Sequence, residues 1–182
     1  MSTTLKDLDG TYTIDPAHSA VGFVARHAMV TKVRGTFTDV EGSATTGANL
    51  HEAKVSLNIA VASVDTRDAK RDGHLRTGDF FEVEKYPAMT FHSTHVSAVD
   101  DDTLRIVGDL TIKDTTKSVS IDFDFNGSAV DPYGNERIGF EGSTVIARSD
   151  YGISFNAALE TGGVLVSDKI TLQLDVSAIK AA

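Results

Sequence analysis

Cysteine and tryptophan are both absent from this chain of 182 residues. Without cysteine the chain cannot form a disulfide scaffold, use a thiolate nucleophile or bind zinc or an iron–sulfur cluster through sulfur. A protein without thiols suits an oxidising or a reducing compartment equally well, so this absence leaves the compartment open. No apolar stretch reaches the roughly 18 residues that a membrane helix needs. We therefore expect no stable membrane insertion.

Positive charge is scarce, because 17 Lys and Arg residues face 26 Asp and Glu residues and give a net charge of −9. This balance argues against a wide basic groove for nucleic acid and against tight docking on anionic lipid. Residues 1–10 are polar and lack the apolar core of a secretion signal. We expect a cytoplasmic protein, or a periplasmic or secreted one if a signal has been removed.

The hydrophobic pattern has a period of two residues, which predicts half-buried β-strands. It is strong at residues 54–61, 103–112, 118–125 and 169–176, and weaker at residues 21–25, 33–37, 89–93 and 138–146. No repeat or linker interrupts the chain, so we expect a single domain over residues 1–182. Eight antiparallel strands with one apolar face form a sandwich or a barrel, and periodicity does not decide between them. Nor does it distinguish a filled barrel from a hollow one.

The segment from residue 65 to residue 85 breaks this alternation. It is rich in charge, and several charged residues lie four positions apart, as neighbours on a helix surface do. Gly73 and Gly78 limit it to short helical pieces. We therefore predict a short helical insertion at about residues 66–80.

Several short segments carry distinctive combinations of residues. They are Tyr12-Thr13-Ile14-Asp15-Pro16-Ala17-His18-Ser19, Arg71-Asp72-Gly73-His74-Leu75, Tyr86-Pro87-Ala88-Met89-Thr90-Phe91, Gly108-Asp109-Leu110-Thr111-Ile112 and Ala147-Arg148-Ser149-Asp150-Tyr151-Gly152-Ile153. In this order they resemble the YceI-like family of bacterial polyisoprenoid-binding proteins, and the resemblance runs from about residue 12 to residue 180. It implies an all-β fold, an extended eight-stranded antiparallel lipocalin-like barrel with a helix over one side. It also implies a homodimer, and a tunnel for a long amphiphile such as a polyisoprenoid, an isoprenoid quinone or a fatty-acid amide.

The inward apolar residues of the strands would line this tunnel, although the same pattern is typical of a packed core. Leu75, Phe80 and Phe81 could cap one mouth of the barrel while the charges around them face water. The predicted ligand-contacting set is Val21, Phe23, His27, Val55, Leu57, Ile59, Leu75, Phe80, Phe81, Phe91, Leu104, Ile106, Leu110, Ile121, Phe123, Phe125, Phe140, Arg148, Leu172 and Leu174.

Two polar members of this set have alternative roles. Arg148 shares strand parity with Ile146 and would point inward, where an unpaired charge is costly. It would then anchor a ligand or, as we favour, pair with Asp150 or another carboxylate and close the barrel end. His27 shares parity with Phe23, and we favour a satisfied core histidine over a partner for a ligand head group.

Other candidate sites are weak. Asp15, His18 and Ser19 are too close in sequence for a catalytic triad, and no Gly-x-Ser-x-Gly motif is present, so we expect Asp15 and His18 to fix the start of the first strand. His92 and His95 would lie on opposite faces of a strand and make a poor metal pair. Metalloprotease and nucleotide-binding motifs are absent. We expect no catalytic residue, no metal and no cofactor other than a bound lipid.

The predicted function is the binding, sequestration or transport of a long-chain amphiphile without covalent chemistry. A lipid-processing enzyme that uses Arg148, Asp150 and His27 is an alternative. A ligand-free stress or interaction protein with a filled barrel is another.

Overall fold

The computed structural model describes residues 5–47, 49–156 and 166–181. Its strands are β1 (Thr11–Ile14), β2 (Ala20–His27), β3 (Thr31–Phe37), β4 (Val40–Thr45), β5 (Lys54–Ala60), β6 (Val64–Asp65), β7 (Ala88–Ala98), β8 (Thr103–Ile112), β9 (Thr115–Val130), β10 (Glu136–Ala147) and β11 (Lys169–Lys180). The helices are α1 (Ala69–Leu75) and the short 3-10 helices η1 (Leu5–Asp7), η2 (Pro16–His18), η3 (Leu50–Glu52), η4 (Val61–Ser63) and η5 (Arg148–Tyr151).

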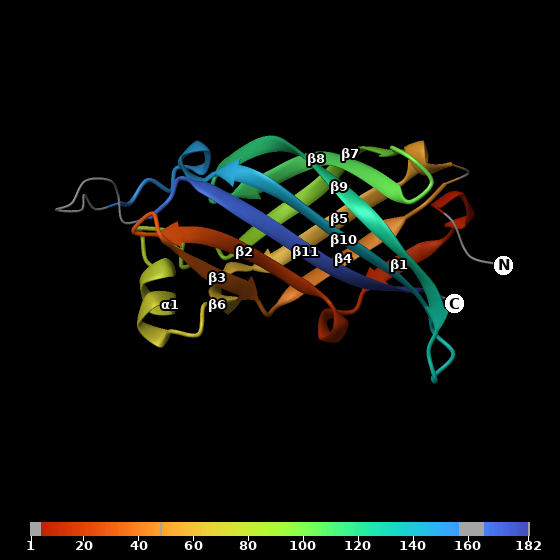
Figure 1. The fold of residues 1–182 in the computed structure, drawn as a ribbon, viewed down its shortest axis with the longest axis horizontal. Coiled ribbons are helices and arrows are strands. Elements are labelled where there is room, and N and C mark those ends of the chain that lie inside the picture. The colour runs from red at the N-terminus through yellow and green to blue at the C-terminus, as the bar shows by residue number, and fades with distance from the viewer. Residues whose placement is uncertain (1–4, 48, 157–165, 182) are drawn as a thin grey trace.

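The strands form one antiparallel sheet that closes on itself, because β1 pairs with both β4 and β11. In the described part of the chain the closed ring runs β1-β4-β5-β7-β8-β9-β10-β11, which makes eight strands. This confirms the barrel and rules out the sandwich. Figure 1 shows an elongated barrel, with α1 beside β3 and β6 at one end and η1 and the end of β11 towards the other.

Three of the eight strand positions around the barrel are each occupied by two consecutive strand segments. β2 continues the line of β1 along β11, and β3 and β6 similarly continue β4 and β5. The break between β1 and β2 is η2, where the Asp15 carboxylate accepts a hydrogen bond from the Ala17 N–H at 3.0 Å and contacts His18 Nδ1 at 2.7 Å. This confirms the predicted structural role of Asp15 and His18.

All eight predicted strands are present, and β1, β4 and β6 were missed. β1 and β6 are too short to show alternation, and the inward positions Gly42 and Ala44 of β4 are too small for a clear apolar pattern. The expected insertion contains α1, which begins after Asp68, whose carboxylate caps the helix by accepting the Arg71 N–H at 3.1 Å. The helix is shorter than the predicted 66–80, because turns replace it after Leu75.

A bulge in β7 corrects one expectation. The register with β8 shifts between Ser93 and His95, so an extra residue enters the strand and reverses its alternation. His92 and His95 are therefore both exposed, where a regular strand would have placed them on opposite faces.

Candidate ligand cavity

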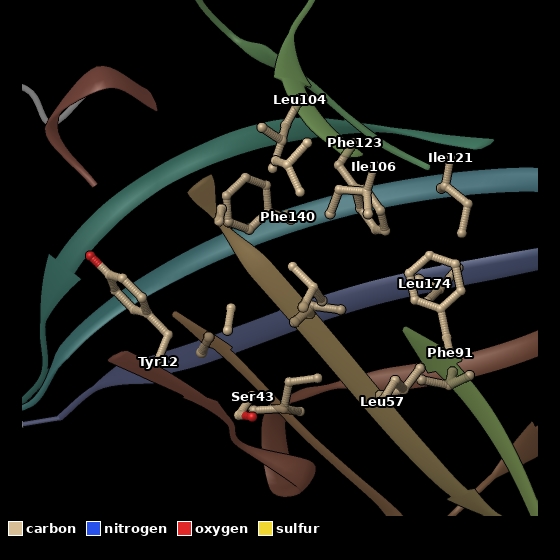
Figure 2. A pocket seen from close by; sticks show the side chains of 18 of the residues that line it. Tyr12, Ser43, Leu57, Phe91, Leu104, Ile106, Ile121, Phe123, Phe140 and Leu174 are labelled. Carbon is tan, nitrogen blue, oxygen red and sulfur yellow. The ribbon is translucent and has the colours of Figure 1, made fainter. Parts of the chain in front are cut away.

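An apolar cavity runs along the inside of the barrel. Its volume is about 170 Å³. Figure 2 shows Leu57, Ile106, Ile121 and Leu174, from four strands, among the side chains that surround it. Most of the predicted wall lies here, namely Val21, Val55, Leu57, Ile59, Phe91, Leu104, Ile106, Leu110, Ile121, Phe123, Phe140, Leu172 and Leu174.

Sequence reasoning missed other lining residues. Ile112, Val119 and Val176 continue the alternation of predicted strands, so the same signal could have included them. Leu8 and Tyr12 lie before the first predicted strand, and no periodicity pointed to them. The remaining apolar members with large side chains are Ile14, Phe37, Leu50, Met89, Val96 and Ile138.

The cavity stays open because phenylalanine rings lie over glycines of the neighbouring strand. Phe123 pairs with Gly142, and a Cβ on Gly142 would stand 2.7 Å from the Phe123 ring. Phe91 covers Gly108 in the same way, since a Cβ there would clash with its ring. Real Cβ atoms do not approach so closely, so larger residues at these two glycines would push the rings into the lumen. The two glycines therefore make room along the axis.

The chemistry of this cavity is almost wholly apolar. No charged residue is found among the described residues that line it. The Tyr12 hydroxyl already donates a hydrogen bond to the Asp9 carbonyl at 3.1 Å. Burial raises the pKa of Tyr12, so it stays neutral. Such a lumen stabilises a hydrocarbon chain and disfavours an ionic group.

The predicted lid residues Leu75, Phe80 and Phe81 do not line the cavity. They pack at the barrel end beside α1, where Phe80 is buried and contacts the rings of His74 and Phe155 at centroid distances of 5.1 and 5.2 Å. Phe81 lies edge-on to Phe37 at 5.9 Å, and Phe37 itself lines the cavity. These side chains form an aromatic plug between the cavity and that end.

Phe23 and Phe125 are half-buried and also lie outside the cavity lining. Phe23 packs against Phe37 at 5.7 Å, and Phe125 packs against Phe140 at 5.1 Å. Both therefore support residues of the wall from the side.

The prediction that Arg148 points into the barrel is wrong. Strand β10 ends at Ala147 and Arg148 begins η5, so strand parity does not apply to it. Its guanidinium is buried and donates to the carbonyls of Ser167 at 2.9 Å, Ile153 at 2.9 Å and Val166 at 3.3 Å. It neither faces the cavity nor pairs with Asp150. Instead it joins η5 to two other backbone segments, at Ile153 and at residues 166–167, near the α1 end.

His27 also departs from its expected place. It is the last residue of β2, and its side chain is exposed at the barrel rim, beyond the lumen. It borders a hollow beside β3, together with Lys32 and Arg34. This position rules out both predicted roles of His27, as a hydrogen-bonded core residue and as a partner for a ligand head group inside the tunnel.

The described residues offer no metal centre and no membrane-spanning helix. Across residues 5–47, 49–156 and 166–181, no group of three or more His, Asp or Glu side chains could hold a metal ion. None of the helices in these ranges is long and apolar enough to cross a membrane.

Comparisons with known proteins place this barrel in a family. The YceI-like domain matches residues 12–178. The chain belongs to the YceI-like family. A UPF0312 protein of Staphylococcus aureus is 37% identical over 167 residues, which are 89% of this chain and 93% of that protein.

Solved structures share the fold of this YceI-like protein. The YCEI protein of Campylobacter jejuni has a TM-score of 0.73 and 32% identity, over 86% of this chain and 90% of its own. BcnA of Burkholderia cenocepacia has a TM-score of 0.79 at 22% identity, over 90% and 98% of the two chains. A polyisoprenoid binding domain from Saccharophagus degradans has a TM-score of 0.73 at 15% identity, over 93% and 98%. The last two likenesses concern the fold alone.

Two of the segments that carried the resemblance build the α1 end of this YceI-like protein. The buried Asp72 accepts hydrogen bonds from the N–H and hydroxyl of Thr66 at 2.8 and 2.6 Å. Asp168 likewise accepts the N–H and hydroxyl of Ser149, both at 3.0 Å. These polar contacts fix the connections around the plug, whereas the cavity wall consists mainly of strand residues.

Proposed function

We propose that this protein binds a long-chain amphiphile, such as a polyisoprenoid, an isoprenoid quinone or a fatty-acid amide, and sequesters or transports it without covalent chemistry. The observation that carries the proposal is the continuous apolar cavity along the barrel axis, whose described lining contains no charge. Membership of the YceI-like family supports it, as does the fold shared with a polyisoprenoid binding domain.

The energetics favour a long ligand. Each buried methylene contributes roughly 0.8 kcal/mol, whereas association costs about 4–15 kcal/mol in lost freedom. A ligand held by apolar contact therefore needs on the order of ten or more buried carbons. Leu104 and Ile112 both line the cavity from β8 and are separated by roughly 26 Å along the strand. The lined length suits a prenyl or acyl chain and exceeds what a short metabolite would fill.

The proposal is tested first by extracting lipid from the purified protein and by weighing the intact protein under native conditions. A near-stoichiometric long-chain amphiphile is expected in the extract and as added mass in the complex. A protein mass without added ligand, together with no uptake of added prenyl quinones or fatty amides, would show that the barrel is empty or filled by its own side chains. That result would overturn the proposal.

Substitutions in the wall locate the ligand. Leu57→Trp and Ile121→Trp place an indole in the lumen from two separate strands, β5 and β9, and should abolish lipid uptake. Asn58→Trp and Ser120→Trp are the matched controls, because these neighbours on the same strands are exposed. Equal uptake by both lumen variants and both controls, all well folded, would contradict the assigned wall. Product formation from a bound lipid would favour an enzyme instead.

A further inference from the structure

The outer surface of the barrel near α1 is positively charged, although the whole chain carries −9. Two hollows adjoin there, one between the edge of β3 and the start of α1, and one over the outer face of β2, β3 and β11. Lys32 and Arg34 border both, so the hollows form one surface, which we call the basic face. Its cations are Arg26, Lys32, Arg34, Arg67, Arg71 and Lys169, and Asp65 is the only acid among its described lining residues.

The strand register brings these cations together at a cost to stability. Arg26 lies directly opposite Lys32 in the antiparallel pair of β2 and β3. Lys169 begins β11 two residues before Thr171, which is the partner of Val24, so Lys169 stands beside Arg26. Like charges opposite one another in a sheet are destabilising. An anionic partner would offset that repulsion.

Ion pairs among the described residues do not neutralise most of these charges. In the ranges that the structure describes, Lys32, Arg34 and Arg67 form no ion pair. Arg26 donates to the Val30 carbonyl at 3.2 Å, and Arg71 donates to Thr66 at 2.7 and 2.8 Å, so both contact neutral acceptors. The charge of the basic face is therefore open to an outside partner.

An apolar tip stands beside the basic face. Met29 and Val30, in the turn between β2 and β3, are 61% and 75% exposed. Ala28 and Met29 have φ angles of +52° and +64°, a turn conformation that usually takes glycine or asparagine. Val145, which borders the basic face, is 57% exposed. Exposed apolar residues next to clustered cations are typical of surfaces that rest on a membrane interface.

We propose that the basic face and the Met29–Val30 tip dock this protein on a bilayer that contains anionic phospholipid. The cations would meet the headgroups and the tip would enter the interface. Docking of this kind deepens the proposed function and rests on it, because a carrier of a membrane amphiphile has to reach a bilayer. Lys and Arg on an edge strand disfavour pairing with another strand, so a peptide partner fits this surface less well.

The net charge of the chain does not oppose this docking. In physiological salt, charges are screened over about 8 Å, so acidic residues elsewhere on the barrel hardly reach the basic face. The composition argued against tight docking on anionic lipid because it averages charge over the whole chain. The fold separates the charges instead.

Sedimentation with vesicles tests the electrostatic part. The ligand-loaded protein should bind vesicles of phosphatidylcholine and phosphatidylglycerol, bind phosphatidylcholine alone weakly, and dissociate as salt rises. Arg34→Glu should weaken binding about 25-fold, because each unit of charge near an anionic leaflet changes affinity about five-fold. Lys54→Glu is the matched control, since Lys54 is exposed on β5 and does not border the basic face.

Fluorescence tests the tip, because the chain lacks tryptophan. The emission of Val30→Trp should shift to shorter wavelength with anionic vesicles, as an indole entering the interface does. The emission of Val130→Trp, at a similarly exposed position at the end of β9, should not shift.

Any of three results would overturn the docking proposal. The protein fails to bind anionic vesicles, Arg34→Glu and Lys54→Glu weaken vesicle binding equally, or the emission spectrum of Val30→Trp does not shift. Displacement by inorganic pyrophosphate at constant ionic strength would also overturn it and indicate a site for a soluble anion. The two proposals fail separately, because lipid content is measured by extraction. A lipid-loaded protein without vesicle binding overturns docking alone, and a docked protein that never holds lipid overturns the proposed function.

Discussion

The α1 end of the barrel and the wall of its lumen are built in contrasting ways. At the α1 end, buried polar side chains each meet specific backbone atoms, as Arg148 meets three carbonyls and Asp72 meets Thr66. The wall contains interchangeable aliphatic side chains and rings that rest on glycines. A specific hydrogen-bond pattern tolerates little substitution, whereas an apolar surface needs only the right volume. The contrast separates the residues that hold the barrel together from those that shape the cavity.

The largest expected effect is at Arg148. Arg148→Met keeps the length of the side chain but leaves the carbonyls of Ser167, Ile153 and Val166 without their buried donor. We expect the free energy of unfolding to fall by about 3–5 kcal/mol. Urea denaturation measures this change.

Arg105→Met is the control for this prediction. Arg105 forms an ion pair with Asp122 at 2.8 Å on the exposed outside of the barrel, where such pairs contribute little. Similar losses for the two variants would contradict the contrast, because they would make the buried carbonyl contacts no more important than a surface pair.

A smaller effect is expected in the wall, at Gly142. A Cβ there would stand 2.7 Å from the Phe123 ring and 2.9 Å from the Asp122 carbonyl, so the ring must swing into the lumen. We expect Gly142→Ala to cost about 1–3 kcal/mol of stability by overpacking and to reduce lipid capacity. Thermal unfolding and lipid extraction of the same sample report the two effects.

Gly139→Ala is the matched control on the same strand, because its Cβ would make an ordinary 3.6 Å contact with Asn126. Equal lipid content in the wild-type protein and both variants would show that Gly142 does not keep the cavity open.

The smallest effect is expected from ion pairs away from α1. Arg137 bridges Asp15 at 2.6 Å and Asp131 at 2.7 Å, and joins the break between β1 and β2 to the turn between β9 and β10. These bonds lower the pKa of Asp15 and of Asp131 to about 2. Because both pKa values lie below that of the unfolded chain, the ionised pairs stabilise the fold above about pH 4, and this contribution is lost as the pH falls towards 2.

The matched variant is Arg137→Met, which lacks these pairs at every pH. We expect the difference in stability between wild type and Arg137→Met to shrink between about pH 4 and pH 2. Chemical denaturation across a pH series measures it. If the difference stays constant through this range, the ionised forms of Asp15 and Asp131 are not stabilised by Arg137.

The accuracy of the sequence predictions followed the regularity of the strands. Leu104, Ile106 and Leu110 on β8 obey strict alternation, and all three line the cavity. The prediction was wrong where the alternation ended, because β10 stops before Arg148 and β2 stops at His27. The prediction was also wrong at His95, because an extra residue in β7 reverses the alternation there. Periodicity describes a strand only while the strand lasts.

The sequence alone determined that the chain forms long antiparallel strands with one apolar face, that a short helix interrupts them, and that no thiol chemistry is available. The strand and helix patterns are local, since they depend on residues two to four positions apart, and the lack of thiols is a matter of composition. Tertiary structure decided the rest. Strand β1 closes against β11, and phenylalanine rings lie over glycines of neighbouring strands. Arg148 reaches the carbonyls of Val166 and Ser167, and cations from β2, β3, α1 and β11 meet on one face of an acidic chain. These contacts join residues far apart in sequence. Only the register of the closed barrel brings those residues together.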